Sequence, residues 1–157
     1  MTESAPISRG PMADTISKQK RSEVMSRIKR RDTKPELTIR KSLFQLGLRY
    51  RVDVGDLPGR PDLYFPRFRA VLFVHGCFWH RHNGCKFAYT PKSNLEFWET
   101  KFRTNIDRDL RALKRLHQLQ LRVGVVWECA ISGPAIDALS SVIASWLRTG
   151  TGDLELP

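Results

Sequence analysis

The sequence is short of the residue types that mark membrane proteins and disulfide-rich secreted proteins. No apolar run approaches the roughly 20 residues that cross a bilayer. The N-terminal stretch MTESAPISRGPMADTISKQKRS contains no hydrophobic signal core. Only three cysteines are present, so they cannot all pair within one chain. We therefore expect a cytoplasmic protein without a disulfide framework.

Acidic residues are also scarce relative to basic ones. The 157-residue chain has 27 Lys and Arg against 16 Asp and Glu, which gives a net charge of +11 and a pI near 10.1. A basic surface that only keeps the protein soluble is one explanation. An excess of this size is more typical of proteins that bind a polyanion, and nucleic acid is the first candidate.

The chain divides by composition into three parts. We expect residues 1–20 to be a disordered tail, residues 21–150 to form one domain and residues 151–157 to be a C-terminal tail. The basic segment RSEVMSRIKRR at 21–31 is either an arm that lies on a polyanion or a packed N-terminal helix. Its apolar residues at helical spacing are Val24, Met25 and Ile28.

The pattern of the remaining chain predicts an α/β domain with a mixed β-sheet flanked by helices. A helix opens at a capping box, Thr33 and Glu36, and closes at Gly47, with Ile39, Leu43 and Leu46 buried. Strand-like runs follow at 48–54, 61–65, 70–74 and 121–127, and an amphipathic helix closes the domain at 134–147. A long helix between the last two strands begins near Ser93 and Glu96. Its expected buried side is Phe102, Ile106, Leu110, Leu113 and Leu116.

The cysteines and histidines concentrate in one stretch, HGCFWHRHNGC at 75–85, which holds three of the four histidines and two of the three cysteines. Cys77, His82 and Cys85 have compact metal-ligand spacing, and Cys129 can supply a distant fourth ligand. Three thiolates and one imidazole complete a tetrahedral zinc site, which is typical of a structural metal. The alternative is a set of reduced core cysteines. The zinc pattern of nucleobase deaminases is absent.

Two histidines of this stretch and one aspartate remain for chemistry. His80 lies two residues from the predicted ligand His82, so it would be held in place, and a fixed imidazole is a good general base. Asp62 lies where the strand at 61–65 begins, and the next strand ends near His75. This arrangement is typical of restriction-type nucleases, although the Glu-x-Lys of their second strand is replaced here by Phe73, Val74 and His75. Alternatively, Asp62 merely caps the chain or pairs with Arg60, and His75 is a hydrogen-bonded strand end.

The motifs LPGRPD, FVHGCFWH, EFW and VVWEC, in this order and spacing, resemble those of the very short patch repair endonuclease (Vsr) family. The resemblance runs from about Arg21 to Ala130. It implies a restriction-endonuclease-like core, a structural Zn²⁺, a catalytic Mg²⁺ and nicking of double-stranded DNA 5′ to the thymine of a T·G mismatch. The loop containing Asn83 and Gly84 is one residue longer than in the family pattern, which leaves every ligand in place.

The resemblance also implies roles for individual residues. Asp62 matches a magnesium ligand, Val74 a main-chain carbonyl that also binds Mg²⁺, and His80 the catalytic histidine. His75 and Glu36 match groups that hold metal-bound water or phosphate, although the capping box alone also explains Glu36. The implied zinc ligands are Cys77, His82, Cys85 and Cys129.

Aromatic residues lie within and beside the predicted metal loop. Phe78 and Trp79, together with Trp98, match residues that the family inserts between base pairs at the mismatch. Aromatic faces can replace the stacking that is lost where a mispaired step opens. Core packing is the alternative, especially for Trp98, which lies four residues before Phe102. The other residues implied to contact DNA are Lys101, Asn105 and Met25.

These observations support one main hypothesis, a Mg²⁺-dependent, mismatch-directed nicking enzyme that acts as a monomer in the bacterial cytoplasm. One alternative is a non-catalytic zinc module that binds distorted DNA, but binding alone needs neither Asp62 nor His80. Another is a restriction-like endonuclease that cuts unmodified duplex.

Overall fold

The computed structural model describes residues 17–27 and 31–157. They belong to two units, one ending at Arg30 and the other running from Arg31 to Pro157. In the first unit, helix α1 spans Lys18–Ser26, so it begins within the segment predicted as a tail. The rest of that predicted tail lies outside the described residues. Met25 is exposed on α1, whereas Ile28 lies outside the described residues.

The second unit is built on a mixed four-stranded sheet, as the pattern predicted. Its strands are β1 (Leu63–Phe65), β2 (Ala70–His75), β3 (Arg122–Trp127) and β4 (Leu154–Leu156), in the order β1-β2-β3-β4. β1 and β2 are antiparallel and are joined by the short 3-10 helix η1 (Pro66–Phe68). β2, β3 and β4 are parallel neighbours. In this register His75 lies beside Trp127, so the carboxyl ends of β2 and β3 meet.

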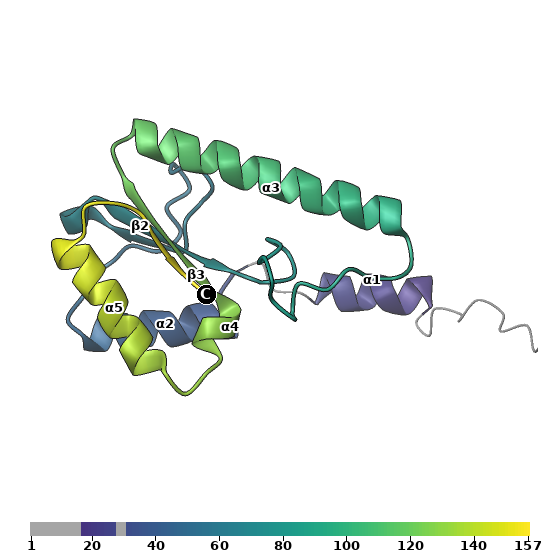
Figure 1. Ribbon diagram of the computed structural model, residues 1–157, viewed down its shortest axis with the longest axis horizontal. Helices are drawn as coiled ribbons and strands as arrows, with labels where there is room; N and C mark the ends of the chain where they lie inside the picture. The colour runs from purple at the N-terminus through teal and green to yellow at the C-terminus, as the bar shows by residue number, and fades with distance from the viewer. Residues whose placement is uncertain (1–16, 28–30) are drawn as a thin grey trace, which may run out of the picture. The chain divides into compact units, whose positions relative to one another are not determined.

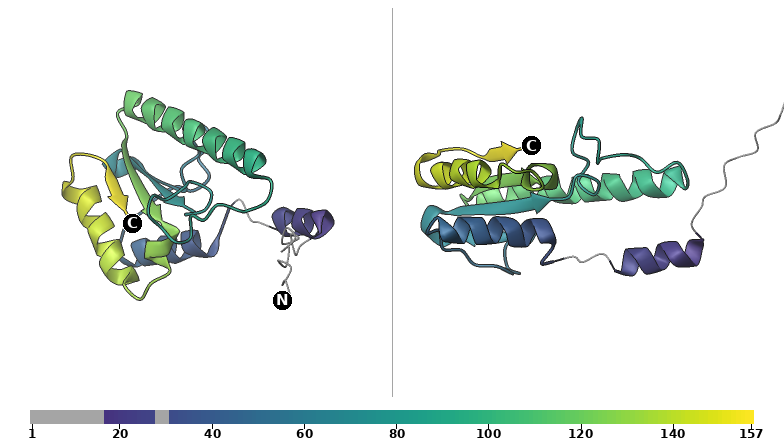
Figure 2. Two further views of the ribbon diagram at one scale, coloured as in Figure 1. Left: turned by 45° about the vertical axis from the view of Figure 1, so that its right-hand side comes forward. Right: turned by 90° about the horizontal axis from the view of Figure 1, so that it is seen from below.

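Helices cover both faces of this sheet (Figures 1 and 2). Alternate strand residues enter two separate hydrophobic clusters, as expected for a sheet buried on both sides. One cluster joins Leu63, Leu72 and Val126 to helices α2 (Lys34–Gln45) and α5 (Ile136–Thr149). The other joins Val71 and Val123 to helix α3 (Leu95–Gln118). The short helix α4 (Glu128–Ile131) directly follows β3.

Two predicted boundaries were wrong. The run at 48–54 forms only one bridge to the sheet, between Arg51 and Tyr64, because Asp53 adopts a left-handed conformation, φ 60°, that turns the chain away. Residues 151–157 are not a free tail, since they contain β4. Their alternating Leu-Glu-Leu lets Leu154 and Leu156 pack on the cluster formed with α2 and α5.

Two predicted buried faces also need correction. Leu46 is 39% exposed because α2 has ended at this position and Gly47 turns the chain at φ +79°. On α3, Ile106 and Leu110 are 40% and 59% exposed. Phe102 and Leu116 are buried as predicted, and the other buried residues of α3 are Trp98, Asn105 and Ala112. The helix is therefore turned so that polar Asn105 faces inward, toward the loop that follows β2. None of the described helices is long and apolar enough to cross a membrane.

Candidate active site and metal centre

The four predicted zinc ligands come together at the carboxyl ends of β2 and β3. The ligand atoms of Cys77, His82, Cys85 and Cys129 all lie within 4.8 Å of one another. His82 Nδ1 is 3.6 Å from Cys77 Sγ and 3.4 Å from Cys129 Sγ. All three cysteines are free thiols. This donor set suits a tetrahedral metal ion and leaves no open coordination position.

Local backbone bonds and the parallel strand pair position these ligands. The His82 N–H donates to the carbonyl of Cys77, and the Cys85 N–H donates to the carbonyl of His82. Cys77 and Cys129 each follow one of two adjacent parallel strands, which explains how a ligand distant in sequence reaches the loop. Burial raises the pKa of the Cys77 thiol to about 12, and this proton must leave when the sulfur binds a metal ion.

Two further residues support the metal centre from β3 and α4. Glu128 Oε1 accepts a hydrogen bond of 2.9 Å from the Cys77 N–H. The His82 ring stacks on Trp127 with 4.3 Å between centroids and an interplanar angle of 5°. Neither residue was singled out from the sequence, although both lie within the VVWEC motif. Partners of this kind fix the orientation of metal ligands.

Asp62 lies at the entrance of β1, next to the end of β2. Its Oδ2 accepts a hydrogen bond of 2.7 Å from the Val74 N–H, so this side chain caps the strand pair. Burial raises the pKa of the Asp62 carboxyl to about 6; the Val74 bond lowers it and the Glu36 charge raises it further. Among the described residues, no ion pair joins Asp62 to Arg60, which counts against the ion-pair alternative, whereas the bond from Val74 agrees with the capping alternative.

The preceding turn holds Asp62 in place through a glycine. Gly59 has φ +74°, and a Cβ at this position would lie 2.7 Å from the Ala112 Cβ and 3.2 Å from the Phe73 ring. Only glycine therefore fits both the left-handed turn and the close approach of α3. This explains the glycine of the LPGRPD motif and links it to the position of the carboxylate that follows.

Glu36 is 5% exposed at the start of α2. Its carboxylate accepts hydrogen bonds from the Asp32 N–H (2.8 Å) and the Thr33 hydroxyl (2.9 Å). The predicted capping box therefore forms in a modified version, since Thr33 bonds the glutamate rather than the backbone. Arg40 Nη2 also lies 3.3 Å from Glu36, and its charge lowers the pKa of Asp62. Glu36, Asp62 and Arg40 thus form one electrostatic group.

His80 has a carboxylate partner that the sequence did not indicate. Its Nδ1 lies 2.5 Å from Asp109 Oδ2 on α3. The His75 ring stacks on the His80 ring, with 3.9 Å between centroids and an interplanar angle of 5°. Burial lowers the pKa of His75 to about 3, and the neighbouring His80 lowers it further. His75 is therefore a neutral ring against which His80 packs.

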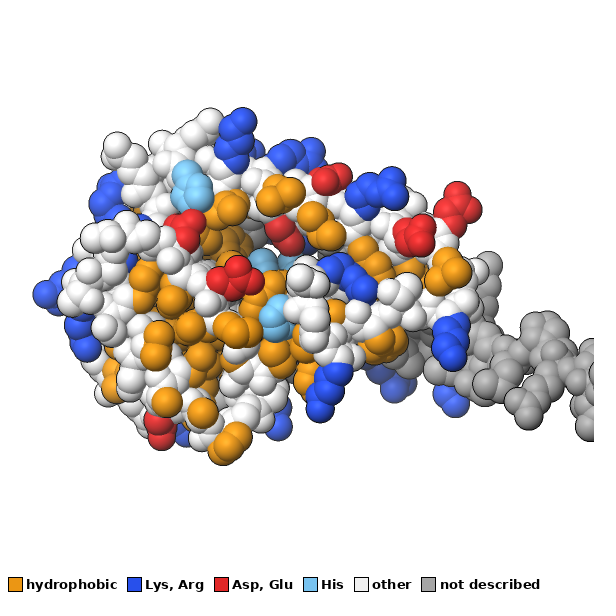
Figure 3. All heavy atoms as spheres, viewed as in Figure 1, with side chains coloured by type: hydrophobic (Ala, Val, Ile, Leu, Met, Phe, Trp, Pro, Cys, Tyr) orange, Lys and Arg blue, Asp and Glu red, His pale blue; other side chains and the backbone are white. Residues whose placement is uncertain are grey.

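His75, His80 and Asp109 are close enough to be considered as a second metal site, since their ligand atoms lie within 4.8 Å of one another. The parallel rings argue against it. Imidazole lone pairs lie in the ring plane, so two stacked rings cannot point at one ion. The arrangement instead resembles a carboxylate that orients a histidine base. Figure 3 shows histidine side chains in a hollow of this face, next to a carboxylate.

The aromatic residues form a cluster beside the metal loop. The Phe78 ring contacts the rings of Trp79, Trp98 and Phe102 at centroid distances of 5.0, 5.4 and 5.2 Å. Phe78 and Trp79 are partly exposed, whereas Trp98 is only 8% exposed. Trp98 thus packs beneath the pair in this conformation and does not project from the surface.

The two polar residues of α3 that were predicted to contact DNA also differ in exposure. Lys101 is exposed, whereas Asn105 is 8% exposed. The Asn105 amide donates a hydrogen bond of 3.2 Å to the carbonyl of Trp79. Asn105 therefore holds the backbone of the aromatic pair, just as Asp109, one turn further along α3, holds His80.

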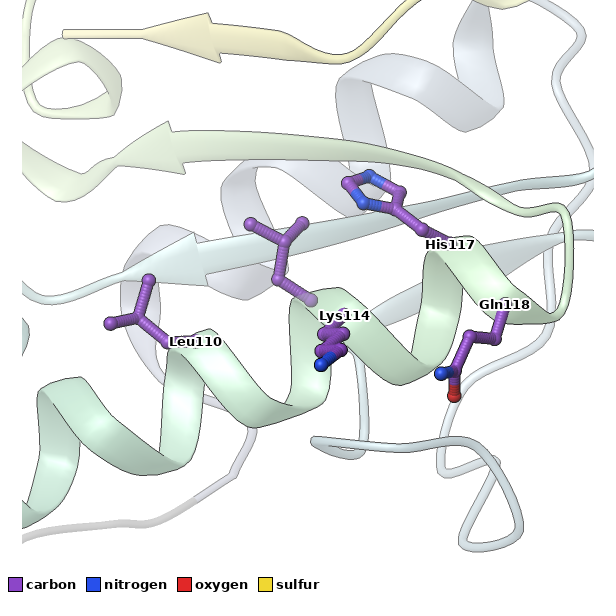
Figure 4. Close-up of a pocket in the computed structure, with 5 residues that line it drawn as sticks. Leu110, Lys114, His117 and Gln118 are labelled. Carbon is purple, nitrogen blue, oxygen red and sulfur yellow. The ribbon is translucent and has the colours of Figure 1, made fainter.

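The structure thus brings most of the predicted site residues of the second unit together around the end of β2, and adds Asp109, Glu128 and Arg40. Among the described residues, Lys101 lies on α3 without a contact to them. An open depression along α3 contains none of the predicted site residues (Figure 4). It is lined by Leu110, Leu113, Lys114, His117 and Gln118. With no cysteine or carboxylate, this depression is a weaker candidate than the histidine cluster.

Comparisons with known proteins identify the family of the chain. A profile described as DNA mismatch endonuclease Vsr matches residues 13–86. The type II nicking enzyme V.XorIIP of Xanthomonas oryzae pv. oryzae is 44% identical over 121 residues, 77% of this chain and 88% of the relative. The type II nicking enzyme V.NmeAIP of Neisseria meningitidis is 41% identical over 125 residues, 80% and 89% of the two chains. The DNA mismatch endonuclease Vsr of Escherichia coli is 41% identical over 139 residues, 87% and 88%. The chain therefore belongs to the DNA mismatch endonuclease Vsr family.

Proposed function

We propose that this protein is a Mg²⁺-dependent endonuclease that nicks one DNA strand 5′ to the thymine of a T·G mismatch, and so initiates very short patch repair of deaminated 5-methylcytosine. The observation that carries the proposal is the pairing of His80 with Asp109 beside the buried carboxylate of Asp62. A module that only binds DNA needs no oriented base and no desolvated acid. The names of the relatives supply the reaction class, DNA nicking.

The residues fit both metal ions of the proposal. Cys77, His82, Cys85 and Cys129 would hold a structural Zn²⁺, since they provide a closed Cys₃His set. Asp62 and the main-chain carbonyl of Val74 would hold Mg²⁺, which prefers oxygen ligands. The charge of Glu36 acts on Asp62, so two carboxylates supply the negative potential that attracts a divalent cation. A bound Mg²⁺ would stabilise negative charge on the phosphate and on the leaving oxygen.

Proton transfer is assigned to the histidine pair. Asp109 accepts a hydrogen bond at His80 Nδ1, which leaves Nε2 free to take a proton from the attacking water. His75 packs against the His80 ring and limits its rotation. The water oxygen then attacks phosphorus, the bond between phosphorus and the sugar oxygen breaks, and one strand is nicked.

Recognition of the mismatch is assigned to the aromatic cluster. Phe78 and Trp79 are partly exposed and would enter the weakened base step. Trp98 and Asn105 support them from below. Lys101 is exposed on the same helix and would contact the DNA directly. Met25 is exposed on α1 and would provide a further contact. We also propose that the protein acts as a monomer in the bacterial cytoplasm, on the nucleoid when bound to DNA.

One assay tests this proposal against its alternatives. End-labelled T·G and C·G duplexes are incubated with wild-type protein and with Asp62→Asn, with Mg²⁺ or without it. We expect a single nick in the T·G duplex only, in Mg²⁺ only, and with wild type only. Equal cutting of both duplexes would indicate a restriction-like enzyme. Tight mismatch binding without any nick would indicate a binding module.

A further inference from the structure

An exposed tyrosine extends the aromatic cluster beyond the residues assigned above. Tyr89 is 64% exposed, which is more than any other large hydrophobic side chain among the described residues. Its ring nevertheless contacts Phe78, with 5.1 Å between centroids and an interplanar angle of 45°. An aromatic ring in this position has one side on the cluster and most of its surface in solvent.

The loop that carries Tyr89 is fixed at several points. It begins at the metal-site residue Cys85, whose carbonyl accepts a hydrogen bond of 3.0 Å from the Ala88 N–H. Arg81 donates to the carbonyl of Tyr89 (2.9 Å) and to the Thr90 hydroxyl (3.0 Å). A ring that is presented by an immobilised loop loses less conformational freedom when it binds a partner.

Arg81 connects this loop to α3. Its guanidinium carbon lies 4.2 Å above the centre of the Phe102 ring, and Phe102 in turn contacts Phe78. Arg81 adopts φ 57°, a left-handed conformation that side chains rarely adopt. It stands between His80 and His82, so the same short segment serves the base, the metal centre and the Tyr89 loop.

The surroundings of Tyr89 favour a polyanion as its partner. The exposed charged side chains of the segment 86–103, which includes Tyr89, are mostly basic: Lys86, Lys92, Lys101 and Arg103 against Glu96 and Glu99. The neighbouring Phe87 differs, because the Lys86 ammonium lies 5.1 Å from the centre of its ring. Tyr89 is therefore the better candidate of the two for contact with a nucleobase.

We propose that Tyr89 is a further DNA-contacting residue, which packs on a base exposed beside the opened step, and that Arg81 is the positioning residue that holds it there. This inference rests on the proposed function and adds to it a binding residue. Stacking of one base on an aromatic ring changes affinity by roughly 5- to 150-fold. Loss of the Tyr89 ring is expected to fall within that range on mismatched DNA.

Equilibrium binding in the Asp62→Asn background tests the proposal, because it separates binding from nicking. Tyr89→Phe keeps the ring and should bind the T·G duplex nearly as wild type. Tyr89→Leu keeps an apolar contact with Phe78 but no aromatic face, and it should lose at least ~5-fold, as should Tyr89→Ala. Phe44→Ala is the matched control. Phe44 is an exposed ring, 54% accessible, on α2, and it also lies under an arginine, Arg49.

A double-mutant cycle tests the role of Arg81. Arg81→Lys keeps the charge but loses the two-pronged contact with the loop, so it should weaken mismatch binding. Combined with Tyr89→Ala it should have no additional effect, because its contribution passes through the tyrosine. Arg49→Lys is the control for loss of an arginine that covers a ring. Metal analysis of each variant should give the wild-type zinc content.

The outcomes separate this inference from the proposed function. If wild type prefers the T·G duplex while Tyr89→Leu and Tyr89→Ala bind it equally well, the Tyr89 proposal is overturned and the function stands. The same holds if Phe44→Ala loses as much affinity, or if the loss follows a loss of zinc. If the Arg81 and Tyr89 effects add fully, Arg81 does not act through Tyr89. If wild type shows no preference for the mismatch, the proposed function itself fails.

Discussion

The contact between Asp109 and His80 gives the most direct test of the catalytic assignment. Asp109→Asn keeps the size of the side chain but removes the negative charge that accepts the Nδ1 proton at 2.5 Å. The amide can donate to Nδ1, which would place the proton on Nε2 and block its use as a base. Since a positioned general base contributes about 10²- to 10⁴-fold to a rate, we expect a loss within that range.

The assay is a single-turnover nicking rate on the T·G duplex at saturating protein and Mg²⁺. Binding should change little, because Asp109 is only partly exposed and contacts His80 and Arg108. Asp107→Asn is the matched control, since Asp107 is an exposed carboxylate on the same helix. A wild-type rate for Asp109→Asn, or an equal loss in the control, would refute the assignment of His80 as an oriented base.

Three further predictions follow from the site. Asp62→Asn should abolish nicking, leave mismatch binding largely intact and, without Mg²⁺ at pH 7.5, raise the free energy of unfolding by up to about 3 kcal/mol. The sign follows because the pKa of Asp62, raised to about 6, makes its ionised form unfavourable in the folded protein. In wild type, the stability that the protonated Asp62 carboxyl contributes is present below its unfolded pKa and is lost as pH rises through about 6, whereas asparagine stays neutral. Urea unfolding of both proteins at pH 4 and 7.5 measures the difference, and an equal effect of the substitution at both pH values would contradict it. Cys129→Ser should lose zinc and unfold the 75–85 loop, which metal analysis and proteolysis of that loop measure; one tightly held equivalent would contradict it. Trp79→Ala should weaken binding to T·G DNA by roughly 5- to 150-fold but barely change binding to matched DNA; paired titrations at one salt concentration measure both, and equal losses would make Trp79 a packing residue.

The Cys/His cluster and strands β1, β2 and β3 could be predicted from sequence because their signals are local and unusual. Two of the three cysteines and three of the four histidines lie within residues 75–85, which leaves few possible ligand sets, and the strands carry runs of Val, Leu and Phe. The pairing of β2 with β3 then brings Cys129 to the loop. The roles of individual residues came from the resemblance to the family, since no spacing alone distinguishes His80 as a base from His82 as a ligand.

The partner of His80 could not be predicted because it depends on how α3 is rotated. Hydrophobicity favours a buried stripe through Ile106 and Leu110, which would turn Asp109 away from the loop. The observed stripe contains Asn105 instead, because the loop needs a donor for the Trp79 carbonyl. The hydrogen bonds that an irregular loop requires can decide which side of a helix is buried, even against its apolar pattern. The sequence of the helix alone does not show these bonds.

Strand β4 extends the support of the metal centre to the last residues of the chain. Glu155 Oε1 accepts a hydrogen bond of 2.9 Å from the Trp127 indole, and Trp127 is the ring on which His82 stacks. Asp153 accepts a hydrogen bond from the Val123 N–H and pairs with His117 on α3. β4 also covers backbone groups of β3 that would otherwise form an exposed sheet edge. Purification tags and truncations at this end would therefore act through a single tryptophan on His82 of the candidate metal site, so an N-terminal tag is the safer choice for metal analysis.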